Sequence, residues 1–250
     1  MRGIFILLLA LPSFLGAQLR IDPKRFAIPE SEIREVLELT IAAFPKSDLP
    51  PLFVTSSPEG PITLFDRSAR GEVIIKLDVR ERYWAQMIYQ FAHELAHVRA
   101  NFRPDARDNK WFEETLCETA SLYALRKLSL TLRDHPNFDS YRHHLHDYAK
   151  KIIANREKVD LKTLAAFYQK HEATLRKDAT DRPLNGAMAV ALLPLFETNP
   201  DHWNSLGALN KTPAQKDLPL SGYFKKWHDD TSAPRRPFVQ KVKSHFLPEK

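Results

Sequence analysis

The chain contains very little cysteine and glycine. One cysteine, Cys117, occurs among 250 residues, and 7 glycines stand against 18 prolines. A single cysteine excludes an intramolecular disulfide even in an oxidising compartment. Scarce glycine and frequent proline indicate few flexible linkers and many stiff segment boundaries. The fold must therefore be stabilised by side-chain packing or by metal ligation rather than by cross-links.

Long hydrophobic runs are missing after the first residues. The N-terminus reads Met-Arg-Gly, followed by an apolar stretch of 12 residues from Ile4 to Leu15. A membrane-spanning helix needs about 20 such residues. A positive start, a short apolar core and a small residue at Ala17 are instead typical of a secretory signal peptide. We expect residues 1–17 to be cleaved, which leaves no membrane anchor and predicts an exported protein, either periplasmic or secreted.

The charged residues form no long block of one sign. The formal net charge is +6, yet lysines and arginines alternate with acidic residues along the chain. A nucleic-acid-binding surface usually concentrates its basic residues. We therefore expect no nucleic-acid partner, and the pattern leaves the oligomeric state open.

The order of predicted elements indicates an α+β fold. A helical pattern over residues 29–44 is followed by short segments rich in β-branched and aromatic residues, which predict a small sheet. Helical periodicity then continues almost to the C-terminus. The predicted strands are 52–55, 62–65 and 72–77, and the later predicted helices are 79–100, 111–128, 138–155, 161–177, 184–197, 219–228 and 235–246. We expect residues 18–130 to form a subdomain with the sheet and two metal-binding helices, and residues 131–250 to form a helical subdomain.

Two histidines of the predicted helix 79–100 are spaced for metal binding. His93 and His97 lie one helical turn apart, on the side opposite the hydrophobic stripe of this helix. Imidazoles at positions i and i+4 can reach one tetrahedral ion, which is why this spacing recurs in zinc sites. Glu94 is expected at the flank of the pair, beside the ion.

The next predicted helix supplies acidic residues. Glu114 and Glu118 share one face of helix 111–128. A carboxylate at the first position can reach the ion, and a carboxylate one turn later can hold the imidazole N–H of a ligating histidine. A solvated acidic face is the alternative interpretation of such a pair. Cys117 is expected off the ligand face, as a small buried apolar side chain.

The combination His93-Glu94-x-x-His97 followed by Glu114-x-x-x-Glu118 resembles the gluzincin branch of the zincin metallopeptidases, which includes the thermolysin-like enzymes. The resemblance covers about residues 71–126. It implies that His93, His97 and Glu114 bind Zn²⁺, that Glu94 is the general base, and that Glu118 is the outer carboxylate.

The resemblance also implies a peptide or protein substrate. An extended peptide would lie along the strand Glu72–Leu77, which is expected at the edge of the sheet. The spacing between His97 and Glu114 is shorter than in thermolysin-like enzymes. Glu113 and Glu118 are therefore alternatives to Glu114 as the third ligand.

The sequence thus predicts a zinc-dependent peptidase that hydrolyses peptide bonds through a metal-activated water, with Glu94 as the general base. A donor to the developing oxyanion is expected from a later helix, where Tyr168, His171 and Tyr141 are the candidates. The alternative is a catalytically inactive zincin-fold protein of the cell envelope that binds peptides or keeps zinc for its structure. The substrate, endo- or exo-specificity and zymogen activation are not specified.

Overall fold

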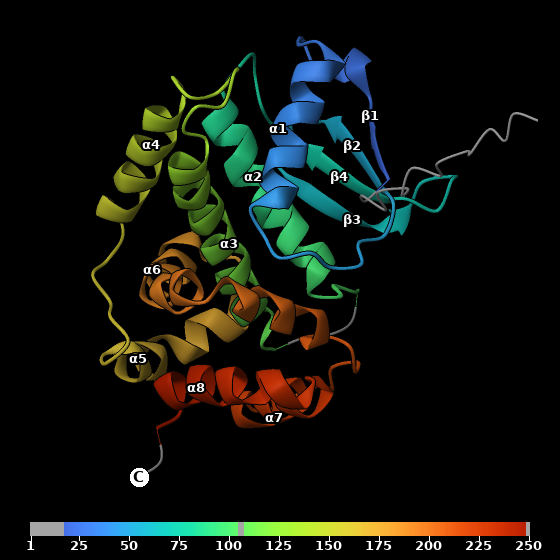
Figure 1. The fold of residues 1–250 in the computed structure, drawn as a ribbon. Coiled ribbons are helices and arrows are strands. Elements are labelled where there is room, and N and C mark those ends of the chain that lie inside the picture. The colour runs from blue at the N-terminus through green and yellow to red at the C-terminus, as the bar shows by residue number, and fades with distance from the viewer. Residues whose placement is uncertain (1–17, 105–107, 249–250) are drawn as a thin grey trace, which may run out of the picture.

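The computed structural model describes residues 18–104 and 108–248. The predicted signal peptide, residues 1–17, lies outside the described residues. Within the described chain, a four-stranded sheet near the N-terminus precedes a mostly helical remainder, which confirms the α+β class (Figure 1). The strands are β1 (Leu19–Ile21), β2 (Leu52–Ser56), β3 (Ile62–Arg67) and β4 (Val73–Leu77).

The strand order is β1-β2-β4-β3, with β1, β2 and β4 parallel and β3 antiparallel to β4. The prediction that the strand Glu72–Leu77 lies at the sheet edge is therefore wrong. The turn at Gly71, whose φ of +80° suits glycine, folds the chain back so that β4 lies between β2 and β3. Strand β3 is the edge strand on this side of the sheet.

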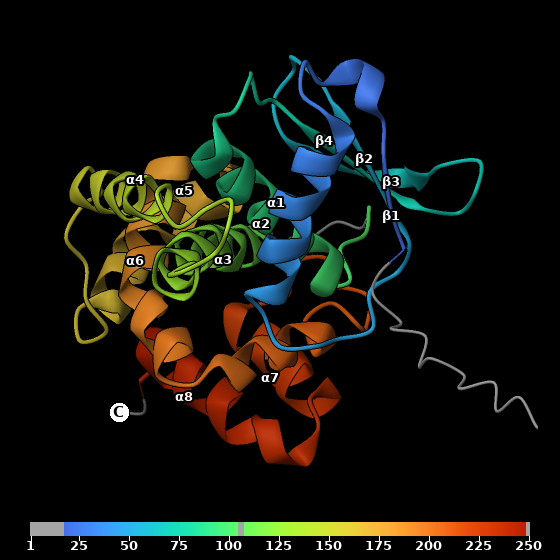
Figure 2. The same cartoon turned by 45° about the horizontal axis from the view of Figure 1, so that its top comes forward.

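Helices α1 (Glu30–Ala42) and α2 (Trp84–Arg99) pack against the sheet and against each other (Figures 1 and 2). The side chains of β4 that alternate toward them, Val73, Ile75 and Leu77, are fully buried. Helix α2 begins later than the predicted residue 79, because residues 79–83 are irregular and Glu81 has a φ of +48°. Asp78 accepts hydrogen bonds at its backbone oxygen from the side chains of Gln86 and Gln90, both on α2.

Helix α3 (Lys110–Thr131) packs along α2 and is also covered by α4 and α6. Because these helices surround it, α3 is buried on almost every side, and even its polar residues Glu113, Thr115 and Thr119 are fully buried. The remaining helices are α4 (Arg142–Ala154), α5 (Leu164–Lys177), α6 (Arg182–Thr198), α7 (Leu220–Asp230) and α8 (Arg236–Phe246), with short 3₁₀ segments at Pro23–Arg25, Pro200–Ala208 and Ala233–Arg235.

One hydrophobic cluster runs from the sheet to α8 and includes residues of both predicted subdomains. Helices α7 and α8 pack together at the end of the molecule away from the sheet (Figure 1). In residues 18–104 and 108–248, no helix combines the length and the apolar character that crossing a membrane requires.

Candidate metal centre

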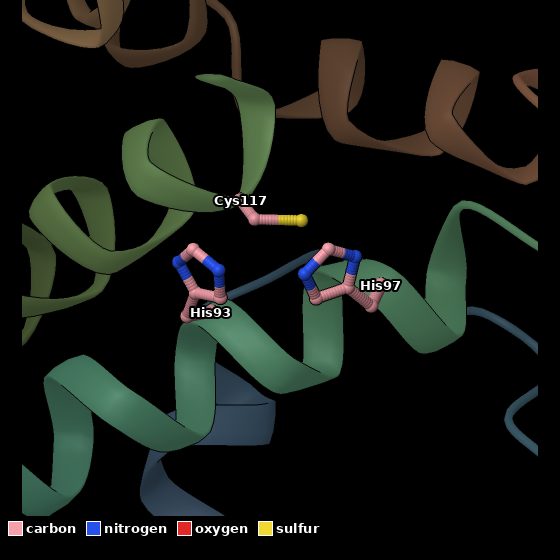
Figure 3. Close-up of side chains that lie close together, drawn as sticks. All are labelled: His93, His97 and Cys117. Carbon is pink, nitrogen blue, oxygen red and sulfur yellow. The ribbon is translucent and has the colours of Figure 1, made fainter. Parts of the chain in front are cut away.

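Helices α2 and α3 bring the predicted metal ligands together. His93 and His97 project from α2 toward α3, and their ring centroids are 5.0 Å apart (Figure 3). The Oε2 atom of Glu114, on α3, lies 3.3 Å from Nε2 of His93 and 3.5 Å from Nε2 of His97. One oxygen of Glu114 thus lies close to the Nε2 atom of both imidazoles.

These separations suit a small tetrahedral ion. Ligand bonds of about 2.0–2.1 Å at tetrahedral angles place neighbouring donor atoms about 3.3 Å apart. The observed distances of 3.3 Å and 3.5 Å from Glu114 Oε2 to the two Nε2 atoms are close to this value. The side chains of His93, His97 and Glu114 are mostly buried, with 21 %, 11 % and 12 % of their surface exposed. The donor set therefore fits a metal ion.

Cys117 lies nearer to the histidines than its place in the helical pattern predicted. Its Sγ atom, one ring nitrogen of His93 and one ring nitrogen of His97 lie within 4.8 Å of one another, and these residues form a group that could hold a metal ion (Figure 3). The expectation that Cys117 would lie off the ligand face is wrong, although its side chain is fully buried as expected. Burial raises the pKa of the Cys117 thiol to about 12, against the opposing influence of His97.

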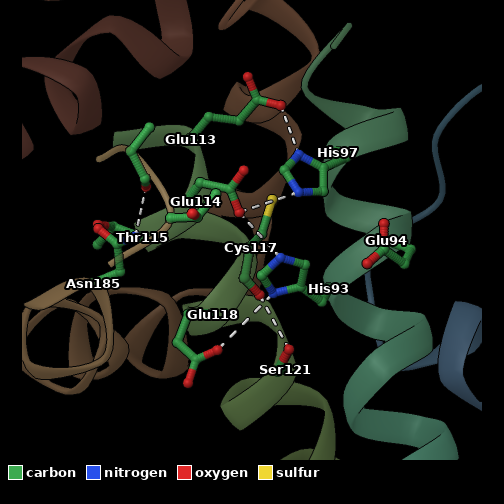
Figure 4. A network of polar contacts seen from close by, with 12 residues as sticks. His93, Glu94, His97, Glu113, Glu114, Thr115, Cys117, Glu118, Ser121 and Asn185 are labelled. Atoms are coloured by element: carbon green, nitrogen blue, oxygen red, sulfur yellow. Dashed lines mark hydrogen bonds and ion pairs between the residues drawn. The ribbon is translucent and has the colours of Figure 1, made fainter. Parts of the chain in front are cut away.

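A second carboxylate contacts the far nitrogen of each imidazole (Figure 4). Glu113 Oε1 lies 2.7 Å from Nδ1 of His97, in a fully buried position. Glu118 Oε2 lies 3.9 Å from Nδ1 of His93, too far for a hydrogen bond but close enough for an ion pair. Glu113, rather than Glu118, therefore makes the hydrogen bond that fixes a ring and leaves its Nε2 free to bind a metal.

Glu113 is itself held by the C-terminal half of the chain. The side-chain amide of Asn210 donates to Glu113 Oε2 at 2.8 Å and to the backbone oxygen of Ala100 at 2.9 Å. The hydroxyl of Tyr223, on α7, donates to Asn210 Oδ1 at 2.8 Å. A continuous hydrogen-bonded chain thus runs from α7 to the imidazole of His97.

Glu118 is held by a different set of donors. Its Oε1 atom accepts hydrogen bonds from the Tyr89 hydroxyl and from the Arg156 guanidinium, the latter at 2.7 Å. Arg156 passes directly over Gly186 of α6, where an added Cβ would lie 2.3 Å from the Arg156 Nε. Glycine at position 186 therefore provides the space that the guanidinium occupies. Burial and the neighbouring charge of Glu118 raise the pKa of Tyr89, so its hydroxyl keeps its proton.

Burial by itself would raise the pKa of Glu114, but the neighbouring imidazoles of His93 and His97 hold it well below its usual range. Lys110 adds a weaker interaction, with its Nζ 3.8 Å from Glu114 Oε1. The Glu114 carboxyl is therefore ionised at neutral pH, which is the form that binds metals.

Glu94 lies on α2 beside the two histidines and lines the same cavity as they do (Figure 4). Its Oε2 atom accepts a hydrogen bond of 2.8 Å from the hydroxyl of Thr63, on β3, and the residue is 3 % exposed. The same threonine hydroxyl also contacts the Glu94 backbone oxygen at 3.3 Å. The contact joins the edge strand β3 to α2, the helix that carries both histidines.

A cavity of about 500 Å³ opens over these residues. It is lined by both histidines and the four acidic residues described above, together with side chains of β3, α4 and the start of α6. Tyr168, His171 and Tyr141 do not line it. Tyr168 stacks on Trp111 with 5.1 Å between the ring centroids, His171 packs on Phe167, and the Tyr141 hydroxyl accepts from the backbone of Ala85.

Several other polar side chains line the cavity in place of those three, among them Tyr148 and Arg156. Sequence reasoning missed both, because Tyr148 is also part of the apolar stripe of its helix and Arg156 lies in the loop that follows. No periodic pattern marks either residue.

Comparison with known proteins identifies no relative of this chain. No protein-family model matches the chain, and the searches of curated proteins and of solved structures also return no match.

Proposed function

We propose that this chain is a zinc-dependent peptidase. The observation that carries the proposal is the orientation of the two imidazoles, each with Nε2 toward Glu114 and Nδ1 toward a further carboxylate. In metal sites the second nitrogen of a ligating histidine almost always faces such a partner, which fixes the tautomer and makes the ring a better donor. His93, His97 and Glu114 would hold the ion.

The remaining groups supply the other parts of a hydrolytic reaction. When bound, a zinc ion provides a Lewis acid for the scissile carbonyl and lowers the pKa of a water molecule. Glu94 accepts the proton of the attacking water and passes it to the departing amine. Thr63 occupies one oxygen of Glu94 and so holds the carboxyl in one orientation. Tyr148 and Arg156, which line the cavity, replace the earlier candidates as donors to the oxyanion.

The edge strand favours a peptide substrate. Ile62 and Phe65 of β3 are each 47 % exposed, and both line the cavity. Edge strands are usually short or protected by charge, because their free backbone groups recruit other chains. An extended peptide that pairs with β3 would satisfy these groups and cover both apolar side chains. Hydrolysis of exported or extracellular peptides also agrees with the predicted signal peptide.

A structural zinc protein of the same fold is the second candidate, and Cys117 favours it. With the Cys117 thiolate as a ligand beside the two histidines and Glu114, four protein groups would close the coordination sphere. Closed tetrahedral sites are typical of structural zinc, whereas catalytic zinc keeps one position for water.

Two measurements separate these candidates. Glu94→Gln should bind one equivalent of zinc and lose chelator-sensitive hydrolysis of a peptide library; wild-type activity in this variant would remove Glu94 as the base. Replacement of zinc by Co²⁺ should give a spectrum without a thiolate charge-transfer band in the near ultraviolet. A strong band that disappears in Cys117→Ser would establish the Cys117 thiolate as a ligand and favour the structural site over the peptidase.

A further inference from the structure

A buried arginine lies at a second site, near the metal centre. Arg99, the last residue of α2, is 7 % exposed. Its two terminal nitrogens both donate to the backbone oxygen of Pro45, at 3.3 Å and 3.2 Å, and its guanidinium lies 5.5 Å from the centroid of the Phe44 ring. Burial lowers the pKa of Arg99 to about 10, and no carboxylate of residues 18–104 and 108–248 offsets this effect. A buried charge without a counter-ion is costly, so such groups are normally paired.

Arg99 lines a pocket of about 370 Å³. A second arginine, Arg67 at the end of β3, also lines this pocket and is exposed to solvent. Asp48 is the acidic residue of the lining, and it is exposed as well. The pocket thus combines a buried cation with an exposed one and is net positive by one charge, with Asn101 and Asn204 as further polar groups.

The pocket adjoins the metal cavity. Phe102 lines both, and its ring stacks on Phe65 of β3 with 5.3 Å between the centroids. Strand β3 connects the two sites, because Thr63 lies at the metal cavity and Arg67 at the second pocket. Four residues of an extended strand span about 13 Å. A peptide paired with β3 would therefore reach both sites.

We propose that this second pocket is a specificity site for an acidic residue of the peptide substrate, bound by Arg99 and Arg67. The proposal rests on the proposed function for the peptide that occupies the metal cavity. A carboxylate supplies the counter-ion that Arg99 lacks, and a guanidinium can hold it through two parallel hydrogen bonds. The separation between Thr63 and Arg67 along β3 places the acidic residue of the substrate about four positions from the peptide bond that is hydrolysed at the metal centre.

A binding experiment tests the proposal without requiring hydrolysis. Zinc-loaded Glu94→Gln protein is incubated with an equimolar library of octapeptides in which each position in turn carries Glu or Gln, and bound peptides are quantified by mass spectrometry. We expect about tenfold enrichment of Glu over Gln at one position, the range of a charge-assisted hydrogen bond. The enrichment should fall to about twofold or less when Arg67→Gln or Arg99→Lys is added.

Arg70→Gln, added to the same background, is the matched control. Arg70 belongs to the same hairpin and carries the same charge, but it does not line the pocket. The enrichment of Glu should persist in Arg70→Gln if the pocket binds the acidic residue. A general preference of a basic protein for acidic peptides would instead lower the enrichment equally in Arg70→Gln and Arg67→Gln. Equal enrichment of Glu at every position, or unchanged enrichment in Arg67→Gln and Arg99→Lys, would overturn the proposal.

Two outcomes distinguish this site from the peptidase itself. If wild-type protein hydrolyses no peptide but Glu94→Gln still selects Glu at one position, the specificity site stands and the peptidase is refuted. If the library shows no selection while succinate alone raises the melting temperature in an Arg99-dependent way, the pocket binds free dicarboxylates and the peptide specificity is refuted.

Discussion

The hydrogen bond between Glu113 and His97 should control metal affinity from outside the coordination sphere. The Glu113 carboxylate accepts from His97 Nδ1 at 2.7 Å through one oxygen and from Asn210 at 2.8 Å through the other. In Glu113→Gln the side chain keeps its shape but has one oxygen and one NH₂ group in place of two oxygens. Because both partners are donors, one of them must then face the NH₂ group without an acceptor. Either the imidazole or Asn210 loses its bond.

The expected loss of zinc affinity follows from the effect of comparable hydrogen-bond partners in other metal sites. Removal of an outer hydrogen-bond partner of a metal-ligating histidine costs about 10–100-fold in metal affinity, which corresponds to about 1.4–2.7 kcal/mol. Asn210→Ala leaves the Glu113–His97 bond in place and should cost less than tenfold. Because both substitutions act through His97, the double variant should bind zinc no more weakly than Glu113→Gln alone.

Zinc affinity is measured by competition with a chromophoric chelator at pH 7.5, and circular dichroism establishes that each variant is folded. Glu197→Gln is the matched control, because this glutamate pairs with Arg126 on another part of the protein and its loss changes the charge equally. A dissociation constant for Glu113→Gln within about twofold of the wild type would refute the assigned role of Glu113. Additive losses in the double variant would show that Asn210 acts by another route.

Two further predictions concern stability. Gly186→Ala should destabilise the wild type, because the new Cβ would lie 2.3 Å from Arg156 Nε. In an Arg156→Ala background the same substitution should stabilise the protein by about 1 kcal/mol, the helix-propensity gain of alanine. Thermal melts measure both effects, with Gly207→Ala, where nothing lies within 4 Å of the added Cβ, as the neutral control, and equal effects of Gly186→Ala in both backgrounds would contradict the steric explanation. The hydrogen bonds from Arg20 lower the pKa of Glu72 to about 2 despite partial burial, so this carboxylate contributes stability above its unfolded pKa of about 4.3 that is lost as the pH falls toward 2. Glu72→Gln should therefore cost about 1 kcal/mol at pH 7 and almost nothing at pH 2 in urea titrations, and a difference that is independent of pH would refute the assignment.

Most elements of the fold are visible in the sequence. The predicted strands and helices agree with the structure to within a few residues at most ends, because β-branched runs and the 3.6-residue period report local burial directly. The main exception at a helix start is α2, where the irregular residues 79–83 delay the helix to Trp84. Strand β1, with only Leu19–Ile21, is too short to produce a periodic signal.

Local sequence patterns predict only part of the candidate site. The positions of His93, Glu94 and His97 on one helix follow from their spacing. The choice among the acids of α3 does not, because Glu113 and Glu114 are adjacent and differ only in the direction that each side chain takes from the helix. Arg156 and Asn210 come from distant segments, and no local pattern connects them to the histidines.

By itself, the sequence determined the α+β class and the pair of helices that carries the histidines and acids, because amphipathic periodicity is a property of each segment alone. The tertiary structure decided that Glu114 faces both Nε2 atoms, that Cys117 lies beside them and that β3 rather than β4 forms the edge next to the cavity. These features depend on the rotation and axial offset of α3 against α2 and on where the β3–β4 hairpin joins the sheet. Such relations are fixed by packing between segments that are distant in the chain, which a local pattern does not encode.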